Sequence, residues 1–231
     1  MIVNSFANDK TPTKLKKEIR EYVQKNRRDF SNAPLEEREA PASPFELFEQ
    51  WFDHVLKSEI TDPYAFTLAT ASAGGMPSAR VVYMRDISEA GLTCYTNYSS
   101  RKGNHLKENP FFCANFYWED LSRQVRFEGK ATKVAPEISD EYFASRPRES
   151  QIGAWASDQS STLKSRKELE EKLRELKNKF EGAPVPRPPH WGGYLLIPSK
   201  VEFWQGRESR LHDRLEYTQN GNSWKLDRLS P

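Results

Sequence analysis

The chain has 231 residues, with 35 lysines and arginines against 33 aspartates and glutamates, so its formal net charge is only +2. A chain of this length can form one full hydrophobic core. The small net charge gives no reason to expect a nucleic-acid partner, because such proteins usually carry a strongly basic domain or face. No run approaches the ~20 apolar residues of a membrane span and the N-terminus lacks a secretory core, so we expect a cytoplasmic protein, with a short amphipathic organelle signal as the alternative.

Residues 1–42 are rich in charge and poor in apolar periodicity, which predicts a mobile N-terminal arm with one short helix around 15–25. Ser43-Pro44-Phe45-Glu46 then supplies an N-cap, a proline at the first helical position and a capping-box glutamate. Aromatic and aliphatic residues at helical spacing follow, up to Leu56, and predict an amphipathic helix that packs on the core. We expect residues 43–231 to form one domain.

From Ala65 the apolar period becomes that of β-strands. Predicted strands cover 65–72, 78–87, 92–97, 111–118 and 123–134. Cys94 and Cys113 lie inside these runs, which favours reduced, packed thiols over a disulfide or a metal site. Several strands at short spacing are typical of a β-barrel or a β-sandwich.

The second half adds two predicted helices and the last strands. The helices cover 136–145 and 162–180, and the second is so highly charged that we interpret it as a solvated face. A proline-rich connector ends it, and strands are predicted at 194–197, 201–204 and 215–226, with Asn220-Gly221 as a hairpin turn signal.

The segment 204–214 sets three arginines and a histidine beside Trp204, where a strand pattern ends. Arginine forks grip phosphate or carboxylate, tryptophan offers a stacking face, and histidine exchanges protons near neutral pH, so the cluster suits a flat anionic ligand. Arg210 and His212 stand two apart, and on an extended segment both would face one side. The alternative is a solvated basic turn.

Residues 95–102 form a predicted strand-to-helix junction. Unpaired backbone N–H groups and the positive end of a helix favour an anion there, and Arg101 and Lys102 add countercharge. An exposed helix start of ordinary composition is an equally good interpretation of this motif alone.

Motifs along residues 43–231 resemble the pyridoxamine 5′-phosphate oxidase family of FMN enzymes. They are Phe203-Trp204-Gln205-Gly206, Arg210-Leu211-His212-Asp213-Arg214, the terminal run 224–231, Arg80-Val81-Val82, Tyr95-Thr96-Asn97, Ser100-Arg101-Lys102, Arg123-Gln124-Val125, the run 145–155, Gln159-Ser160-Ser161 and Trp191-Gly192-Gly193. The resemblance implies a mainly β fold with flanking helices (α+β), an FMN-binding split β-barrel, and a homodimer whose flavin sites are shared between subunits.

The same resemblance implies an activity. Pyridoxamine 5′-phosphate and pyridoxine 5′-phosphate would be oxidised by O₂ to pyridoxal 5′-phosphate, with release of H₂O₂ and, from the amine, ammonia. FMN would be the cofactor, and the partners would be a second copy of the chain, the B6 phosphate and O₂, with no nucleic acid, membrane or metal.

The resemblance also assigns residues. The cofactor-binding positions are Arg80, Val81, Val82, Tyr83, Met84, Arg85, Tyr95, Thr96, Ser100, Arg101, Lys102, Gln124, Gln159, Ser160, Trp204 and Arg214. The substrate-binding positions are Arg20, Tyr22, Arg85, Tyr142, Arg146, Ser150, Arg210, Leu211 and His212, of which Arg210 and His212 are the catalytic pair. On sequence alone, Tyr142 and Arg146 fit helix packing and capping as well as phosphate binding.

Arg85 departs from the family pattern, which usually has lysine at the matching position. An arginine keeps the charge but is bulkier and forked, so this position bears on substrate affinity or release. Two alternatives to the oxidase follow: a split-barrel FMN protein with another redox substrate, and a non-enzymatic carrier of FMN or pyridoxal phosphate in which Arg85 marks lost turnover.

Overall fold

The computed structural model describes residues 17–25 and 28–231. In chain order the elements are α1 (Lys17–Lys25), η1 (Glu37–Glu39), α2 (Pro44–Leu56), β1 (Ala65–Ala71), β2 (Pro77–Tyr83), β3 (Asp86–Ser88), β4 (Gly91–Asn97), α3 (Arg101–Glu108), β5 (Phe111–Trp118), β6 (Arg123–Lys133), α4 (Pro136–Ser145), α5 (Arg148–Ala156), α6 (Arg166–Lys179), β7 (Trp191–Gln205), η2 (Glu208–Arg210), β8 (Asp213–Asn220) and β9 (Ser223–Arg228).

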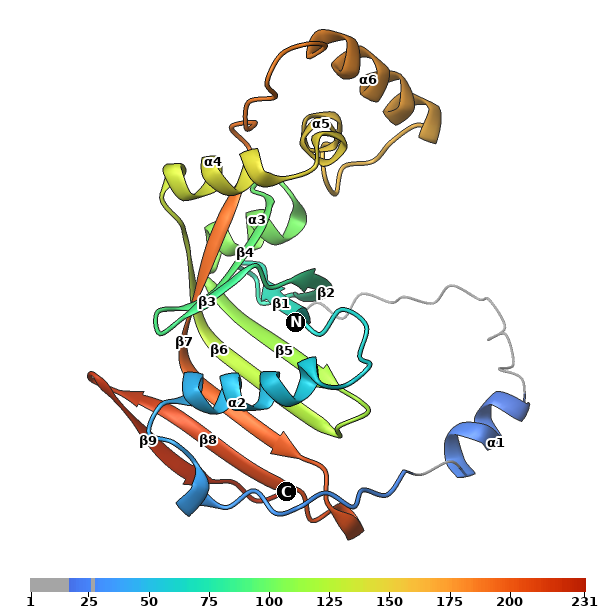
Figure 1. Ribbon diagram of the computed structural model, residues 1–231. Coiled ribbons are helices and arrows are strands. Elements are labelled where there is room, and N and C mark those ends of the chain that lie inside the picture. Colours follow the sequence, from blue (N-terminus) through green and yellow to red (C-terminus); the bar gives the residue numbers. More distant parts are fainter. Residues whose placement is uncertain (1–16, 26–27) are drawn as a thin grey trace, which may run out of the picture.

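The described strands form one antiparallel sheet, in the order β2-β1-β5-β6-β7-β4-β3, with β8 and β9 added beside β7. The long strand β7 joins two halves, because its first residues pair with β4 and its last residues pair with β8. Figure 1 shows the sheet curling between these halves, with α2 across β5 and β6 and with α4, α5 and α6 at the far end. Each half carries its own group of candidate site residues.

The predicted amphipathic helix is confirmed as α2, and its aromatic stripe fills the core. Ser43 caps it by accepting a hydrogen bond from the Phe45 N–H at 3.2 Å. Phe48 is 1% exposed, and its ring lies 5.2 Å from that of Phe116 and 5.3 Å from that of Phe127. Burial of such rings is the main stabilising contribution at this face of the sheet.

Residues 191–205 form one strand, where the sequence predicts two. Pro198 lies between the two predicted strands, and a β-bulge accommodates it: Gly129 pairs with Pro198 and Glu128 with Lys200, so Ser199 is left over. A Cβ atom on Gly129 would stand 2.0 Å from the Ile197 carbonyl oxygen, so only glycine allows this approach. The predicted strand 78–87 is likewise split into β2 and β3, and α5 lies where no helix was predicted.

Helices α4, α5 and α6 enclose a small second core. Phe143, Ile152, Phe180 and Trp191 are each less than 9% exposed there. Arg148 also ties α5 to the connector after α6, donating to the Ala183 carbonyl oxygen at 2.9 Å. These contacts fix the loop between α4 and α5 against the end of β4.

Residues 28–35 of the predicted arm lie along the β8 end of the sheet, whereas α1 lies apart from it (Figure 1). Arg28 donates to the Glu119 carbonyl oxygen at 3.0 Å, and Asn32 donates to the Gly206 carbonyl oxygen at 2.9 Å. The predicted mobility of 1–42 stays a prediction, since 1–16 and 26–27 lie outside the described residues.

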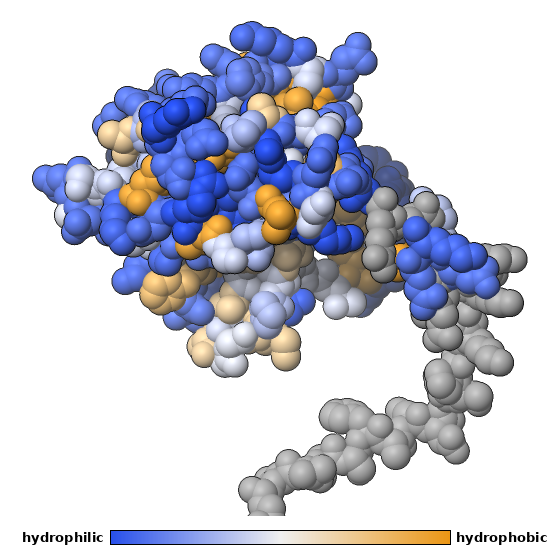
Figure 2. Space-filling model, turned by 90° about the horizontal axis from the view of Figure 1, so that it is seen from below, coloured by the Kyte–Doolittle hydropathy of each residue, from blue (hydrophilic) through white to orange (hydrophobic). Residues whose placement is uncertain are grey.

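The face seen from below is mainly hydrophilic, with hydrophobic residues in small separate patches (Figure 2). Scattered apolar residues of this kind are ordinary on a protein surface, so this face marks no docking site by itself. Across residues 17–25 and 28–231, the model has no helix with the length and apolar character needed to cross a bilayer.

Candidate active site

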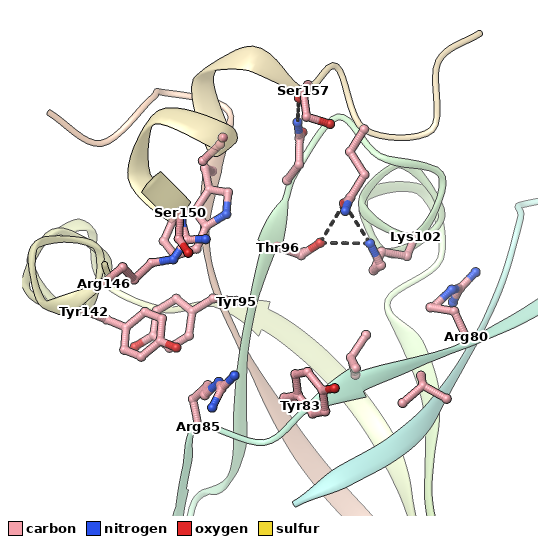
Figure 3. A pocket seen from close by; sticks show the side chains of 17 residues that line it. Arg80, Tyr83, Arg85, Tyr95, Thr96, Lys102, Tyr142, Arg146, Ser150 and Ser157 are labelled. Carbon is pink, nitrogen blue, oxygen red and sulfur yellow. Dashed lines mark hydrogen bonds between the residues drawn. The ribbon is translucent and has the colours of Figure 1, made fainter. Parts of the chain in front are cut away.

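A cavity of about 570 Å³ opens between β2, β4 and the α4–α5 segment (Figure 3). Half of the predicted cofactor and substrate positions line it: Arg80, Val81, Val82, Tyr83, Arg85, Tyr95, Thr96, Lys102, Tyr142, Arg146, Ser150 and Gln159. This volume lies in the usual range for a small-molecule or cofactor site. Its cations gather at two ends, with Arg80 and Lys102 at one and Arg85 and Arg146 at the other, and Figure 3 shows these pairs on opposite sides. We call the first, together with Arg101 beside it, the Lys102 pole, and the second the Arg146 pole.

The Lys102 pole is built on the junction between β4 and α3. Ser100 caps α3, accepting from the Gly103 N–H at 3.3 Å, and this turn brings Lys102 back over β4. Its Nζ atom donates to Thr96 Oγ1 and to Gln159 Oε1, each at 2.9 Å. Arg80 reaches the same region from β2 and donates to the Leu68 carbonyl oxygen at 2.9 Å.

Positive charge is unbalanced at this pole. Burial, reinforced by the nearby Arg80 charge, lowers the pKa of Lys102 to about 8, and burial together with Arg101 lowers the pKa of Arg80. None of the three cations forms an ion pair with an acid in the described part of the chain. A bound anion would relieve this repulsion, and the Lys102 pole therefore fits a phosphate.

Arg101 and Ser160 lie beside the cavity rather than in it. They line an adjoining hollow of about 630 Å³, which shares Asn97 and Gln159 with the first. Ser160 has a φ of 75°, a left-handed conformation that is uncommon for serine and is often found at functional sites.

The Arg146 pole has a donor without a partner. Arg146 Nη1 is buried and makes no hydrogen bond, while its guanidinium lies 4.6 Å from the centre of the Trp191 ring. Burial lowers the pKa of Arg146, and the positive charge of Arg85 lowers it further. An unpaired buried donor is costly, so this position fits an anionic ligand.

Tyr142 forms part of the same wall. Its ring stacks on that of Tyr95 with centroids 3.8 Å apart and planes 12° apart, and both rings are nearly parallel to Trp191. The packing that the sequence offered as an alternative is therefore present, and Tyr142 still lines the cavity. Met84, by contrast, is buried in the main core and does not line it.

Three other predicted cofactor residues lie away from the cavity, in a row across the sheet at the C-terminal end of β7. Gln124 on β6 is directly opposite Trp204 on β7, which is directly opposite Arg214 on β8. Residues paired in this way share one face of a sheet. Arg214 is held in the row by Glu202, whose Oε1 atom accepts from its Nε atom at 2.8 Å.

Arg210, Leu211 and His212 follow this row, but not on an extended segment as predicted. Ser209 and Arg210 have φ values of 55° and 62°, so a left-handed turn presents Arg210. The Arg207 N–H donates to His212 Nδ1 at 3.1 Å, which leaves the proton of the neutral ring on Nε2. Burial and the Arg210 charge lower the pKa of His212, favouring that neutral form.

The residues that line the cavity and the row of Gln124, Trp204 and Arg214 are not brought together within one chain. The cavity is lined from β2, β4, α3 and the α4–α5 segment, whereas the row and His212 lie at the other end of β7. Phe30 stacks edge-on against Trp204 and His212, with centroids 5.7 and 5.5 Å away. Arg20 and Tyr22, the predicted substrate-binding residues of the arm, are on α1. Tyr22 is 68% exposed, and the Arg20 side chain lies outside the described residues.

Sequence reasoning missed Trp191 as a site residue. It lines the cavity and stacks under Arg146, and the signal was the glycine pair that follows it. A Cβ atom on Gly192 would meet the Tyr98 hydroxyl at 2.2 Å, and one on Gly193 would meet the Tyr95 ring at 2.9 Å. Gly153, Ala154, Ser157 and Asn97 complete the lining.

Two family models match the chain. One described as pyridoxamine 5′-phosphate oxidase covers residues 52–180, and one described as the pyridoxine 5′-phosphate oxidase C-terminal dimerisation region covers residues 191–231. The chain is 50% identical over 205 residues to a pyridoxine/pyridoxamine 5′-phosphate oxidase of Rubrobacter xylanophilus, which spans 89% of this chain and 94% of that protein. The corresponding protein of Paraburkholderia phymatum is 50% identical over 206 residues, spanning 89% and 97%.

Solved structures agree on the fold. PhzG from Burkholderia lata 383, crystallised in complex with tetrahydrophenazine-1-carboxylic acid, superposes with a TM-score of 0.81 at 32% identity, covering 87% of this chain and 99% of that one. A pyridoxamine 5′-phosphate oxidase-related, FMN binding protein from Nostoc punctiforme gives 0.65 at 18% identity, covering 83% and 100%. The fold class predicted from the sequence is thereby confirmed.

Proposed function

The chain belongs to the pyridoxamine 5′-phosphate oxidase family, and from this premise we propose how its residues divide the work of the reaction. The enzyme oxidises pyridoxamine 5′-phosphate and pyridoxine 5′-phosphate with O₂ to pyridoxal 5′-phosphate, using FMN and releasing H₂O₂. The observation that carries the division is the pair of cationic poles at opposite ends of one cavity. Two poles suit the two phosphates of the reaction, one on FMN and one on the substrate.

We assign the FMN phosphate to the Lys102 pole. Its three cations have no acidic partner among the described residues, and Thr96, Ser100 and Gln159 supply further polar groups around Lys102 Nζ. Val81, Val82 and Tyr83 then follow Arg80 along the same wall of the cavity, while Met84 packs behind them in the main core. When bound, FMN accepts a hydride from the substrate carbon and passes the electrons to O₂.

We assign the substrate phosphate to the Arg146 pole. The free Nη1 donor of Arg146 supports this, and Arg85 and Ser150 line the same end of the cavity. A guanidinium can donate two parallel hydrogen bonds to a phosphate while a hydroxyl satisfies a third oxygen. The Tyr95–Tyr142 stack forms an apolar floor beside it.

The enzyme is a homodimer through the C-terminal dimerisation region, and we propose that each flavin site is shared between its subunits. The separation of the cavity from the row of Gln124, Trp204 and Arg214 within one chain supports this sharing. In the dimer, the row and the Arg210–His212 turn of one copy would complete the cavity of the other. A closed two-fold dimer contains two such composite sites.

Within that composite site, Arg210 and His212 orient the substrate ring. The hydrogen bond from the Arg207 N–H keeps Nδ1 of His212 unprotonated, so Nε2 is a donor toward the ligand and not a proton acceptor. Arg210 adds a positive charge beside it. Placement of the reacting carbon by such groups is the main contribution that a protein makes to cofactor chemistry.

The remaining predicted features are part of the same proposal. Residues 43–231 form the oxidase domain, residues 1–42 are an arm whose Arg20 and Tyr22 close over the substrate, and the protein works in the cytoplasm. The segment 28–35, tied to Gly206 and Asp213, supports a path for the arm toward the Arg210–His212 turn.

Oxygen uptake by the FMN-loaded protein tests the activity. With pyridoxamine 5′-phosphate we expect steady uptake, with one pyridoxal 5′-phosphate and one H₂O₂ formed per O₂. A carrier would bind FMN and pyridoxal 5′-phosphate without uptake, and a split-barrel protein with another redox substrate would show uptake only with that substrate. Either result would remove the oxidase assignment.

A further inference from the structure

We propose that Asp62, Tyr64 and Tyr83 form a bracket that positions Arg85 for the substrate phosphate. Asp62 and Tyr64 both precede β1 and do not line the cavity. The inference rests on the proposed function, in which Arg85 and Arg146 receive that phosphate. The bracket makes these two residues determinants of substrate affinity through Arg85.

One carboxylate holds both rings of the bracket. The Tyr64 hydroxyl donates to Asp62 Oδ1 at 2.9 Å, and the Tyr83 hydroxyl donates to Asp62 Oδ2 at 3.2 Å. The rings meet edge to face, with centroids 5.3 Å apart. Each oxygen of Asp62 thus anchors one tyrosine, and the pair is fixed at its outer edge.

The Arg85 guanidinium lies over both rings. Its central carbon is 5.3 Å from the centre of the Tyr64 ring and 5.1 Å from that of Tyr83. Arg85 forms no ion pair with an acid among residues 17–25 and 28–231, so the aromatic faces hold it while its N–H donors stay available. Cation–π contacts of this kind contribute through the ring faces and do not use the donors.

The backbone fixes the parts of the bracket relative to each other. Asp62 has a φ of 53°, and its carbonyl oxygen accepts from the Ala65 N–H at 2.8 Å in a tight turn. Tyr83 is paired with Ala65 across β1 and β2, and the Met84 N–H donates to the Tyr64 carbonyl oxygen at 2.9 Å. Arg85 is itself anchored by its N–H, which donates to the Thr93 carbonyl oxygen at 2.9 Å.

The bracket explains an arginine at a position where the family usually has lysine. A flat guanidinium can lie on two rings and still point donors outward, whereas an ammonium is a compact charge with no face to stack. Held there, the Arg85 charge acts on Arg146, whose pKa it lowers. The two cations therefore repel until a phosphate binds, and the bracket keeps Arg85 from turning away.

A double-mutant cycle on the FMN-loaded protein tests this positioning. The dissociation constant of pyridoxal 5′-phosphate is measured by calorimetry for the wild type, Tyr64→Phe, Arg85→Ala and the double variant. Tyr64→Phe keeps the ring under Arg85 but removes its hydrogen bond to Asp62, so we expect it to weaken binding by about two- to fivefold, near the value of one hydrogen bond, and to have almost no effect when Arg85 is absent. In Arg85→Lys the effect of Tyr64→Phe should also fall, because a compact ammonium does not stack on the fixed ring.

Two control variants separate positioning from general damage. Tyr217→Phe removes another hydrogen-bonded tyrosine hydroxyl, which donates to the Pro41 carbonyl oxygen at 2.8 Å and does not line the cavity. Asp62→Asn should weaken the hold on both tyrosines and reduce the binding of pyridoxal 5′-phosphate, and Asp120→Asn, which neutralises an exposed acid in the turn between β5 and β6, is its control. Neither Tyr217→Phe nor Asp120→Asn should alter that binding. An equal effect of Tyr64→Phe with and without Arg85, or no binding of pyridoxal 5′-phosphate, would overturn the bracket. Intact coupling without oxygen uptake by the wild type would instead remove the oxidase and leave the bracket standing.

Discussion

Lys102 and Gln159 are 57 residues apart in the chain, yet Lys102 Nζ donates to Gln159 Oε1 at 2.9 Å. This contact joins the β4–α3 junction to the loop after α5 and surrounds a buried cation with neutral oxygens. Burial and the nearby Arg80 charge lower the pKa of Lys102 to about 8, and these neutral oxygens stabilise the ammonium less than a phosphate would.

FMN binding should depend on pH through Lys102. Bound phosphate raises the pKa of Lys102 from about 8, so above pH 8 the protein takes up a proton when FMN binds. The affinity should therefore fall about tenfold between pH 7 and pH 9, where the phosphate is already a dianion. Fluorescence titration should show a flat, weaker profile for Lys102→Met and no such dependence for riboflavin. A slope that persists in Lys102→Met would place the titrating group elsewhere.

Removing charge from the Lys102 pole should affect FMN but not its dephosphorylated analogue. Arg101→Ala combined with Lys102→Ala should weaken FMN by roughly tenfold or more, because charged hydrogen bonds of about 1.5–3 kcal/mol each are lost. Riboflavin affinity should change by less than about twofold, since it makes no phosphate contact. Parallel titrations of the two flavins decide this, and equal losses would show that the phosphate lies away from this pole.

Arg146→Ala should raise the Michaelis constant for pyridoxamine 5′-phosphate by about ten- to two-hundredfold, the value of one charged hydrogen bond. Turnover of unphosphorylated pyridoxamine should hardly change, because it has no phosphate to bind at this pole. The exposed Arg174 on α6 supplies the control, and Arg174→Ala should leave both substrates unaffected. If both substrates lost the same factor, the Arg146 pole would not be the phosphate site.

Arg210 and His212 should affect the substrate and spare the cofactor. His212→Ala should lower kcat/KM for pyridoxamine 5′-phosphate by roughly ten- to two-hundredfold, with the flavin spectrum nearly unchanged. Arg210→Gly should do the same while keeping the left-handed backbone at φ 62°, which alanine would strain. Loss of FMN with normal turnover per bound flavin would move these residues to the cofactor site.

The bulge between β6 and β7 should be sensitive to a single methyl group. Gly129→Ala places a Cβ atom 2.0 Å from the Ile197 carbonyl oxygen, so the strands must separate. We expect a loss of about 1–3 kcal/mol in the free energy of unfolding. Gly74→Ala is the matched control, since its Cβ atom would meet only Ser72 Oγ at 3.9 Å. Thermal unfolding measures the stability of both variants, and an equal loss of stability in the two would contradict this account of the bulge.

The sequence predicted what local signals encode. The cap and apolar spacing of residues 43–56 define α2, because a helix start and an amphipathic face are both local features. The strand-to-helix junction at 95–102 was predicted for the same reason, and β4 and α3 confirm it. The single strand β7 was not predicted, because the bulge at Pro198 that keeps it continuous depends on Gly129, which is far away in the sequence.

The site was only partly visible for a related reason. The register that aligns Gln124, Trp204 and Arg214 depends on three strands pairing, and the stacking of Arg146 on Trp191 depends on helices α4 and α5 packing against β7. No spacing in the sequence encodes either contact. The resemblance to the family supplied Gln124, Trp204, Arg214 and Arg146, whereas only the structure shows how they lie relative to one another and to Trp191.

Subunit complementation tests the shared site most directly. One variant carries Arg85→Ala and Arg146→Ala, the other carries Arg210→Gly and His212→Ala, and the two are coexpressed with different tags so that mixed dimers can form. Random pairing gives half mixed dimers, each with one intact composite site of two, so roughly a quarter of wild-type oxygen uptake should return. If each site were contained in one chain, every site would keep a defect, and the mixture would stay as inactive as its parents.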